Sequence, residues 1–219
     1  MAIAELQARV HRMQGTRAGR RPLETLPALA GLVPGGLSAG AAYSVTGSAT
    51  LAMALMAGPS AAGQWCGVVG VPEFGAEAAA ATGVELARTI LVPDPGDAWL
   101  GVTSTLVDVL SVIVVRPATR VYDAEASRLA ARLRQRGTTL VALGDWPRAE
   151  ARLAVTDSTW VGVGDGHGHL RGRQVTVGVT GRSGRPHRSR LWLPAPDAQI
   201  RAVEPVASPD VGAGEGMAS

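Results

Sequence analysis

Short apolar runs alternate with helical patterns along the first two thirds of the chain. Continuous apolar runs predict buried strands at 42–46, 65–71, 87–94, 111–117 and 138–145. Helices are expected between them at about 48–58, 72–84, 95–110 and 123–137, with Asp97 as the N-cap of the third and Gly137 at the end of the last. This repetition predicts an α/β fold with a mainly parallel central sheet and helices on both of its faces.

The pattern changes after residue 150. Apolar and polar residues then alternate between glycine-rich turns, which predicts C-terminal antiparallel strands added to the sheet. Residues 197–219 are rich in proline, glycine and alanine without periodicity, so a flexible tail is expected there. The main domain is therefore expected at 23–196, after an N-terminal helix and linker at 1–22.

The N-terminal segment carries apolar residues at helical spacing, namely Ile3, Leu6, Val10 and Met13. This spacing predicts a short amphipathic helix that ends before the basic linker TRAGRRP. Such a helix can dock in the groove of a partner, which would make these four residues a partner-binding stripe. It can also fold back onto its own core, and the sequence leaves both interpretations open.

Composition narrows the chemistry that is available. The chain has 219 residues, 46% of them hydrophobic, which suits one globular domain, and its net charge of +3 is mild. Every Lys/Arg position is an arginine, so chemistry that requires a lysine is excluded. The single cysteine, Cys66, lies in an apolar run and is predicted to be a buried, unreactive thiol. Neither a signal-peptide core nor a membrane-length apolar run is present, so a cytoplasmic location is expected.

Residues 43–56, YSVTGSATLAMALM, have the outline of a phosphate-binding loop. A working loop reads G-x-x-x-x-G-K-[ST], where backbone N–H groups and the lysine bind phosphates and the hydroxyl binds Mg²⁺. Here the final part reads Gly47, Ser48, Ala49, Thr50, without the lysine, and the four-residue arch before the glycine is missing. We therefore expect no nucleotide cofactor at this degenerate loop and assign no catalytic residue.

A second charged position supports this expectation. The apolar run Val112–Val115 is followed by Arg116, at the place where ATPases of this type carry a Mg²⁺-organising aspartate. The arginine would repel a metal ion, and it could bind an anion or pair with Asp145 or Glu73. Glu73 lies two residues from the expected place of a catalytic carboxylate. The sequence therefore predicts a pseudo-ATPase.

Histidines and arginines gather in the C-terminal part. His167, His169 and His187, with Asp165, offer too few ligands at suitable spacing for a metal site, so a glycine–histidine turn is expected. Six arginines at alternating strand positions could line one face and contact DNA phosphates weakly, or could form a solvated basic face. They are Arg171, Arg173, Arg182, Arg185, Arg188 and Arg190.

The segments PGGLSAGAAYSVTG, TLAMALMAG and SVIVVRP, and the strands after TTLVALGD, together resemble the core of RecA-type recombinases. The resemblance covers about residues 23–195 and implies a RecA-like core. Only WPRA follows Asp145, where a recombinase has a long glycine-rich DNA-binding loop. Because the ATP loop, the metal aspartate and the DNA loop are lost or shortened, the resemblance implies no recombinase activity.

An arginine-rich, truncated RecA-like chain of this kind resembles the actinobacterial ImuA-prime family. That resemblance implies a cytoplasmic accessory factor of the SOS response, nucleoid-associated on DNA damage, that acts in translesion synthesis and mutagenesis. The implied partners are an ImuB-type inactive Y-family polymerase-like protein and, through it, an error-prone C-family polymerase. Two alternatives remain: a SulA-like inhibitor of cell division and a protein that still binds a nucleotide.

Overall fold

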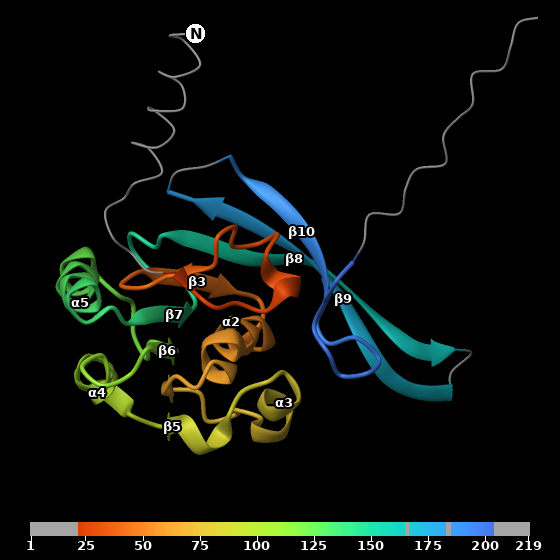
Figure 1. Ribbon diagram of the computed structural model, residues 1–219, viewed down its shortest axis with the longest axis horizontal. Helices are drawn as coiled ribbons and strands as arrows, with labels where there is room; N and C mark the ends of the chain where they lie inside the picture. The colour runs from red at the N-terminus through yellow and green to blue at the C-terminus, as the bar shows by residue number, and fades with distance from the viewer. Residues whose placement is uncertain (1–21, 165–166, 183–184, 204–219) are drawn as a thin grey trace, which may run out of the picture.

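The computed structural model describes residues 22–164, 167–182 and 185–203 (Figure 1). Within these ranges the chain forms a nine-stranded mixed sheet in the order β11-β10-β9-β8-β3-β7-β6-β4-β5. A separate antiparallel pair joins β1 (Pro22–Leu23) to β2 (Leu37–Ser38). The predicted α/β class, with a largely parallel sheet and C-terminal antiparallel strands, is confirmed.

Six neighbouring strands of the large sheet are parallel. They are β3 (Ala42–Thr46), β4 (Cys66–Val69), β5 (Thr89–Val92), β6 (Val112–Val115), β7 (Thr139–Leu143) and β8 (Ala151–Gly164). Each of the five predicted apolar runs forms one of these strands. The first of them, β3, lies between β7 and β8, so it is at the centre of the sheet.

The remaining strands are antiparallel: β9 (His167–Gly181), β10 (His187–Trp192) and β11 (Arg201–Ala202). Strands β8 and β9 form a long hairpin that extends past the helical layers (Figure 1). The expected glycine–histidine turn at 167–169 is wrong, because all three residues belong to β9. Since β11 lies at 201–202, regular structure also continues beyond residue 197, where the tail was expected to begin.

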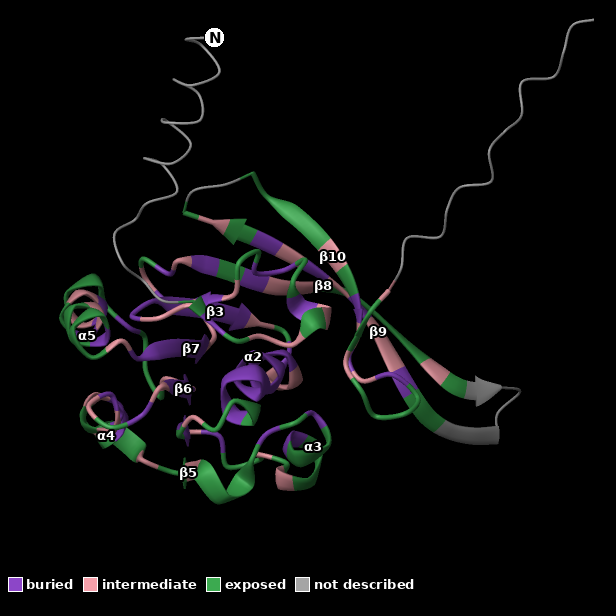
Figure 2. Cartoon of the chain, viewed as in Figure 1, coloured by how far each residue is buried: buried purple, intermediate pink, exposed green. Residues whose placement is uncertain are grey.

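Helices cover the two faces of the sheet. On one face lie α2 (Ala49–Ala61) and α3 (Ala76–Ala81), and on the other α4 (Trp99–Leu106) and α5 (Asp123–Arg136). Three 3₁₀ turns complete the chain: η1 (Pro27–Leu29), η2 (Leu86–Arg88) and η3 (Gly96–Ala98). Helix α2 is the most deeply buried (Figure 2), because η1 and the strands β3 and β8–β10 also pack around it.

Several predicted boundaries need correction. Helix α2 does not end at Gly58 but runs to Ala61 with Pro59 inside it. A Cβ at Gly58 would come within 2.6 Å of the Glu24 carbonyl oxygen, so the glycine allows close packing of the segment before η1. Asp97 does not cap α4, because it lies within η3 and Ala98 occupies the N-cap position. The end of α5 at Gly137 is confirmed, with a left-handed φ of 73°.

The layer formed by α4 and α5 covers only part of its face of the sheet. Apolar residues of α4 and α5 pack on β6 and β7, together with Trp146 from the loop after β7. Across β3, β8 and β9 the same face carries polar residues and borders a hollow in place of a helix. This open part of the sheet, beside the carboxyl end of β7, positions the candidate site.

Candidate functional site

The junction between β3 and α2 holds the degenerate loop. Ser48 is the N-cap of α2, and its hydroxyl oxygen accepts a hydrogen bond from the Leu51 N–H at 3.2 Å. This bond satisfies one of the free N–H groups in the first helical turn, which in a phosphate loop would face the ligand. Ser48 is buried, so the helix start is capped from within the protein.

Gly47 lies tightly between β3 and the hairpin strand β8. Its φ is +83°, and a Cβ added there would come within 3.2 Å of the Val155 Cβ and 3.3 Å of the Val155 carbonyl oxygen. The glycine is therefore needed for a left-handed turn against β8. Ala49 and Thr50 belong to the first turn of α2, and neither supplies the charge of a lysine. The junction at Gly47 and Ser48 therefore connects β3 to α2 directly, and it has no loop that could surround a phosphate.

Arg116 follows β6 and forms an ion pair with Glu73, which follows β4. One of the two predicted partners is thus confirmed. The other, Asp145, pairs with Arg152, with 3.3 Å between Oδ1 and Nη1. A backbone hydrogen bond to its carboxylate and then the Arg116 guanidinium hold the pKa of Glu73 below its usual range, so the carboxylate stays ionised. This pair lies at the place where ATPases with a phosphate loop carry a Mg²⁺-organising aspartate.

Cys66 is the first residue of β4 and is buried. Burial raises the pKa of its thiol to about 12, against a smaller opposing effect of a hydrogen bond with Ser60. A thiol with such a pKa is protonated at neutral pH and is a weak nucleophile. The predicted unreactive, buried cysteine is therefore confirmed.

The arginines between 171 and 190 do not line one face, so that expectation is wrong. Arg173 is on the face of the buried Val175, where its Nε donates to the Ser158 hydroxyl at 2.7 Å and its guanidinium lies 5.5 Å from the centre of the Trp160 ring. On β10, Arg188 is paired with Gly178 and Arg190 with Thr176, both on the opposite face. The physical reason is strand parity, since neighbouring residues alternate between faces.

Histidine ligands for a metal are not assembled among the described residues, where no group of three or more His, Cys, Asp or Glu side chains could hold an ion. His187 contacts the Gly31 carbonyl oxygen through Nε2 at 2.9 Å. Asp165 and the side chains of His167 and His169 lie outside the described residues. The N-terminal residues Ile3, Leu6, Val10 and Met13 also lie outside them.

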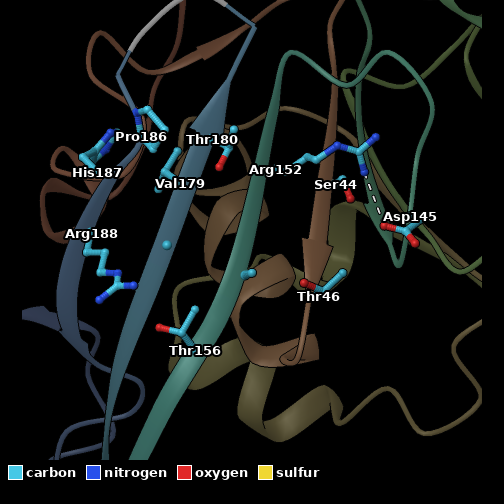
Figure 3. A pocket seen from close by; sticks show the side chains of 12 residues that line it. Ser44, Thr46, Asp145, Arg152, Thr156, Val179, Thr180, Pro186, His187 and Arg188 are labelled. Carbon is cyan, nitrogen blue, oxygen red and sulfur yellow. Dashed lines mark hydrogen bonds and ion pairs between the residues drawn. The ribbon is translucent and has the colours of Figure 1, made fainter.

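A hollow of about 450 Å³ lies on the open sheet face (Figure 3). Parallel pairing sets Ser44 of β3 beside Arg152 of β8, and Arg152 is in turn paired with Thr180 of β9. Thr46 and Thr156 add hydroxyl groups further along the strands, and Arg188 closes the far side. The lining is thus rich in hydroxyl donors and carries guanidinium groups.

A second hollow of about 770 Å³ continues from the first, since both are lined by Asp145 and Arg152. It lies at the carboxyl ends of β6 and β7 and adds Arg120, Asp123 and Arg148. In open α/β sheets ligands bind outside the carboxyl ends of the strands. We call the two hollows together the basic trough, defined by its charged residues Arg120, Asp123, Asp145, Arg148, Arg152 and Arg188.

Arg152 is the central residue of the basic trough. Besides its ion pair with Asp145, its Nη2 donates to the Trp146 carbonyl oxygen at 3.0 Å. Sequence reasoning missed Arg152 and Ser44, which are far apart in the chain and meet only because β8 pairs with β3. The available signal was the alternation of apolar and polar residues that starts at Ala151, which places Arg152 on the face opposite Leu153.

Together these features define a class: an α/β protein with a mixed sheet, a strand–glycine–helix junction capped by its own serine, and a basic trough on one sheet face. The particular family follows from sequence. The family model described as the MT3502 N-terminal domain, MT3502_N, matches residues 31–148. The chain belongs to this family, and the matched segment holds β3 to β7 and all four α-helices that the structure describes.

One relative is the uncharacterized protein Rv3395c of Mycobacterium tuberculosis. It is 36% identical over 128 residues, which are 56% of this chain and 63% of the relative. The match therefore spans less than two thirds of the mycobacterial protein. Among the described residues of this chain, no helix has both the length and the apolar character to cross a membrane.

Proposed function

We propose that this protein is a non-catalytic, RecA-like adaptor of a DNA-damage-induced translesion polymerase complex. It binds an ImuB-type inactive Y-family polymerase-like protein and, through it, an error-prone C-family polymerase. Such an adaptor works in the cytoplasm and joins the nucleoid on damage. The proposal extends the resemblance to the ImuA-prime family, and the mycobacterial relative is consistent with that source.

The observation that carries the proposal is the junction at Gly47 and Ser48. Ser48 caps α2 from within, and Val155 fills the space beside Gly47 where a phosphate arch would need room. The ion pair of Arg116 with Glu73 places a positive charge where a Mg²⁺-organising carboxylate would stand. These features support a fold that is retained for binding other proteins, since the groups for phosphoryl chemistry are replaced.

Co-purification from DNA-damaged cells tests the proposal. A tagged full-length chain is expected to recover the polymerase-like partner after damage. The predicted amphipathic helix gives a sharper test: Leu6→Asp with Val10→Asp should abolish recovery, while the matched pair Gln7→Asp with His11→Asp on the polar side should not. Both double variants should keep the melting temperature of the wild type.

Two results would contradict the adaptor function, and a third would contradict the partner-binding role of the N-terminal helix. Recovery of the tubulin-like division protein without any polymerase subunit would favour the SulA-like alternative. Recovery of neither protein would contradict the adaptor role. A large loss of melting temperature in the Leu6 and Val10 variant alone would mean that this segment packs on its own core.

A further inference from the structure

The basic trough carries more positive than negative charge. Its charged residues are four arginines and two aspartates. Arg148 and Arg152 pair with Asp123 and Asp145 at 3.4 and 3.3 Å. In the part of the chain that the structure describes, neither Arg188 nor Arg120 has an acidic partner, and the Arg120 guanidinium lies 6.0 Å from the centre of the Tyr122 ring. The trough is therefore suited to a ligand with several negative charges.

The described chain ends beside this trough. Strand β11 runs antiparallel to β10, with Leu191 opposite Ala202 and Trp192 opposite Arg201. The Val203 N–H then donates to the Arg190 carbonyl oxygen at 3.0 Å. Because the two strands run in opposite directions, the described chain ends at Val203 while running along β10 toward Arg188, at the rim of the trough.

The segment that follows is acidic. Residues 204–219 read EPVASPDVGAGEGMAS, with Glu204, Asp210 and Glu215 and no arginine or lysine. The net charge of this segment is therefore opposite to that of the trough beside which it begins. Its larger apolar residues, Val206, Val211 and Met217, are spread along the segment and do not form a continuous apolar run.

We propose that residues 204–219 bind in the basic trough, where their carboxylates contact its arginines. The lengths agree. Four strand spacings of about 4.8 Å separate β10 from β7, which is about 19 Å. Six extended residues, from Glu204 to Asp210, span up to about 20 Å at about 3.3 Å per residue. Glu204 can thus reach Arg188, Asp210 can reach Arg152, and Glu215 can reach Arg148 and Arg120.

The contact is intramolecular, so it does not require a tight ligand site. A segment tethered at the rim has an effective concentration on the order of millimolar, and weak charge pairs suffice to hold it. Exposed pairs of this kind are screened by salt. An acidic partner or a nucleic-acid strand would have to displace the segment before it could bind the trough. The inference goes beyond the adaptor function and does not depend on it.

Backbone amide NMR of the full chain at low ionic strength tests the contact. The neutral-tail variant Glu204→Gln with Asp210→Asn and Glu215→Gln keeps the length and shape of the segment. Compared with wild type, it should shift the amides of Ser44–Thr46, Arg152–Thr156 and Arg188, and leave the opposite face near Arg171 and Arg173 unchanged. About 0.5 M salt should move the wild-type spectrum toward that of the variant.

A trough variant provides the reciprocal test. Arg152→Gln with Arg188→Gln should remove the effect of the tail substitutions, whereas the matched control Arg171→Gln on the opposite face should retain it. The proposal is overturned if wild type and neutral-tail variant have the same trough amide shifts at low salt. It is equally overturned if the shifts map to the Arg171 face, or if they persist when both trough arginines are replaced.

Discussion

Arg116, directly after β6, forms an ion pair with Glu73, which follows β4, so two strand ends at one edge of the sheet share a neutralised charge. In P-loop ATPases a carboxylate at the end of such a strand helps to hold the metal ion. Here a guanidinium occupies the place, and the nearby acid is engaged by it. The pair therefore joins the chain just after β6 to the segment that follows β4.

Replacing Arg116 by alanine should raise the pKa of Glu73 toward its ordinary value of 4.5. The rise should be partial, because the largest effect on this carboxyl is a backbone hydrogen bond that the substitution leaves in place. An NMR pH titration of the Glu73 side chain measures it, with Arg120→Ala as a control that leaves the pair intact. An unchanged Glu73 pKa in the Arg116 variant would contradict the pairing.

Gly47→Ala should destabilise the fold more than Gly83→Ala. Both glycines have positive φ, so each substitution costs about 1–2 kcal/mol in backbone strain. Only at Gly47 does the added Cβ meet a neighbour, Val155, and the crowding should add about 1 kcal/mol or more. Chemical denaturation measures both, and Val155→Ala should relieve part of the loss in the Gly47 variant. Equal losses at the two glycines would show that β8 does not press on the loop.

Ser48→Ala should cost about 1 kcal/mol of stability, because it removes the hydroxyl that caps α2. Ser48→Gly should cost only a few tenths of a kcal/mol, since glycine is tolerated at this position. Equilibrium unfolding in urea measures the free energy of unfolding of both variants and distinguishes the two losses. If Ser48→Ala left stability unchanged, the serine would be free for another role, and the assignment of the junction as a structural cap would fail.

Asp108 should make stability depend on pH in the acid range. Arg132 hydrogen-bonds its carboxylate, with 2.9 Å between Nε and Oδ1, and with Arg136 lowers the pKa of Asp108 below its ordinary value of 3.8. Because the folded pKa is the lower one, the contribution is complete above the ordinary pKa and is lost as pH falls through the folded value. Wild type should therefore be more stable than Asp108→Asn near neutral pH, and the difference should vanish in acid. A difference that persists in acid would contradict the charge pairing.

Most of the fold could be predicted, because strands that are buried on both faces of the sheet have continuous apolar sequences. The continuous apolar run Val112–Val115 predicts an interior strand, and Gly137 predicts the end of a helix. The basic trough could not be predicted in this way. Ser44 and Arg152 are neighbours only through the parallel pairing of β3 with β8, and no local pattern encodes that partnership. The prediction that the arginines share one face was wrong for a related reason. The register of β9 with β10 places Arg173 and Arg188 on opposite faces of the sheet.

We propose that a RecA-like fold is kept here without its nucleotide chemistry. Equilibrium titration of the full chain with labelled ATP in the presence of Mg²⁺ tests it most directly. We predict no saturable binding up to millimolar nucleotide, because the loop lacks a lysine and an arch and Arg116 is paired with Glu73. Saturable binding with micromolar affinity, lost on Ser48→Ala, would contradict it.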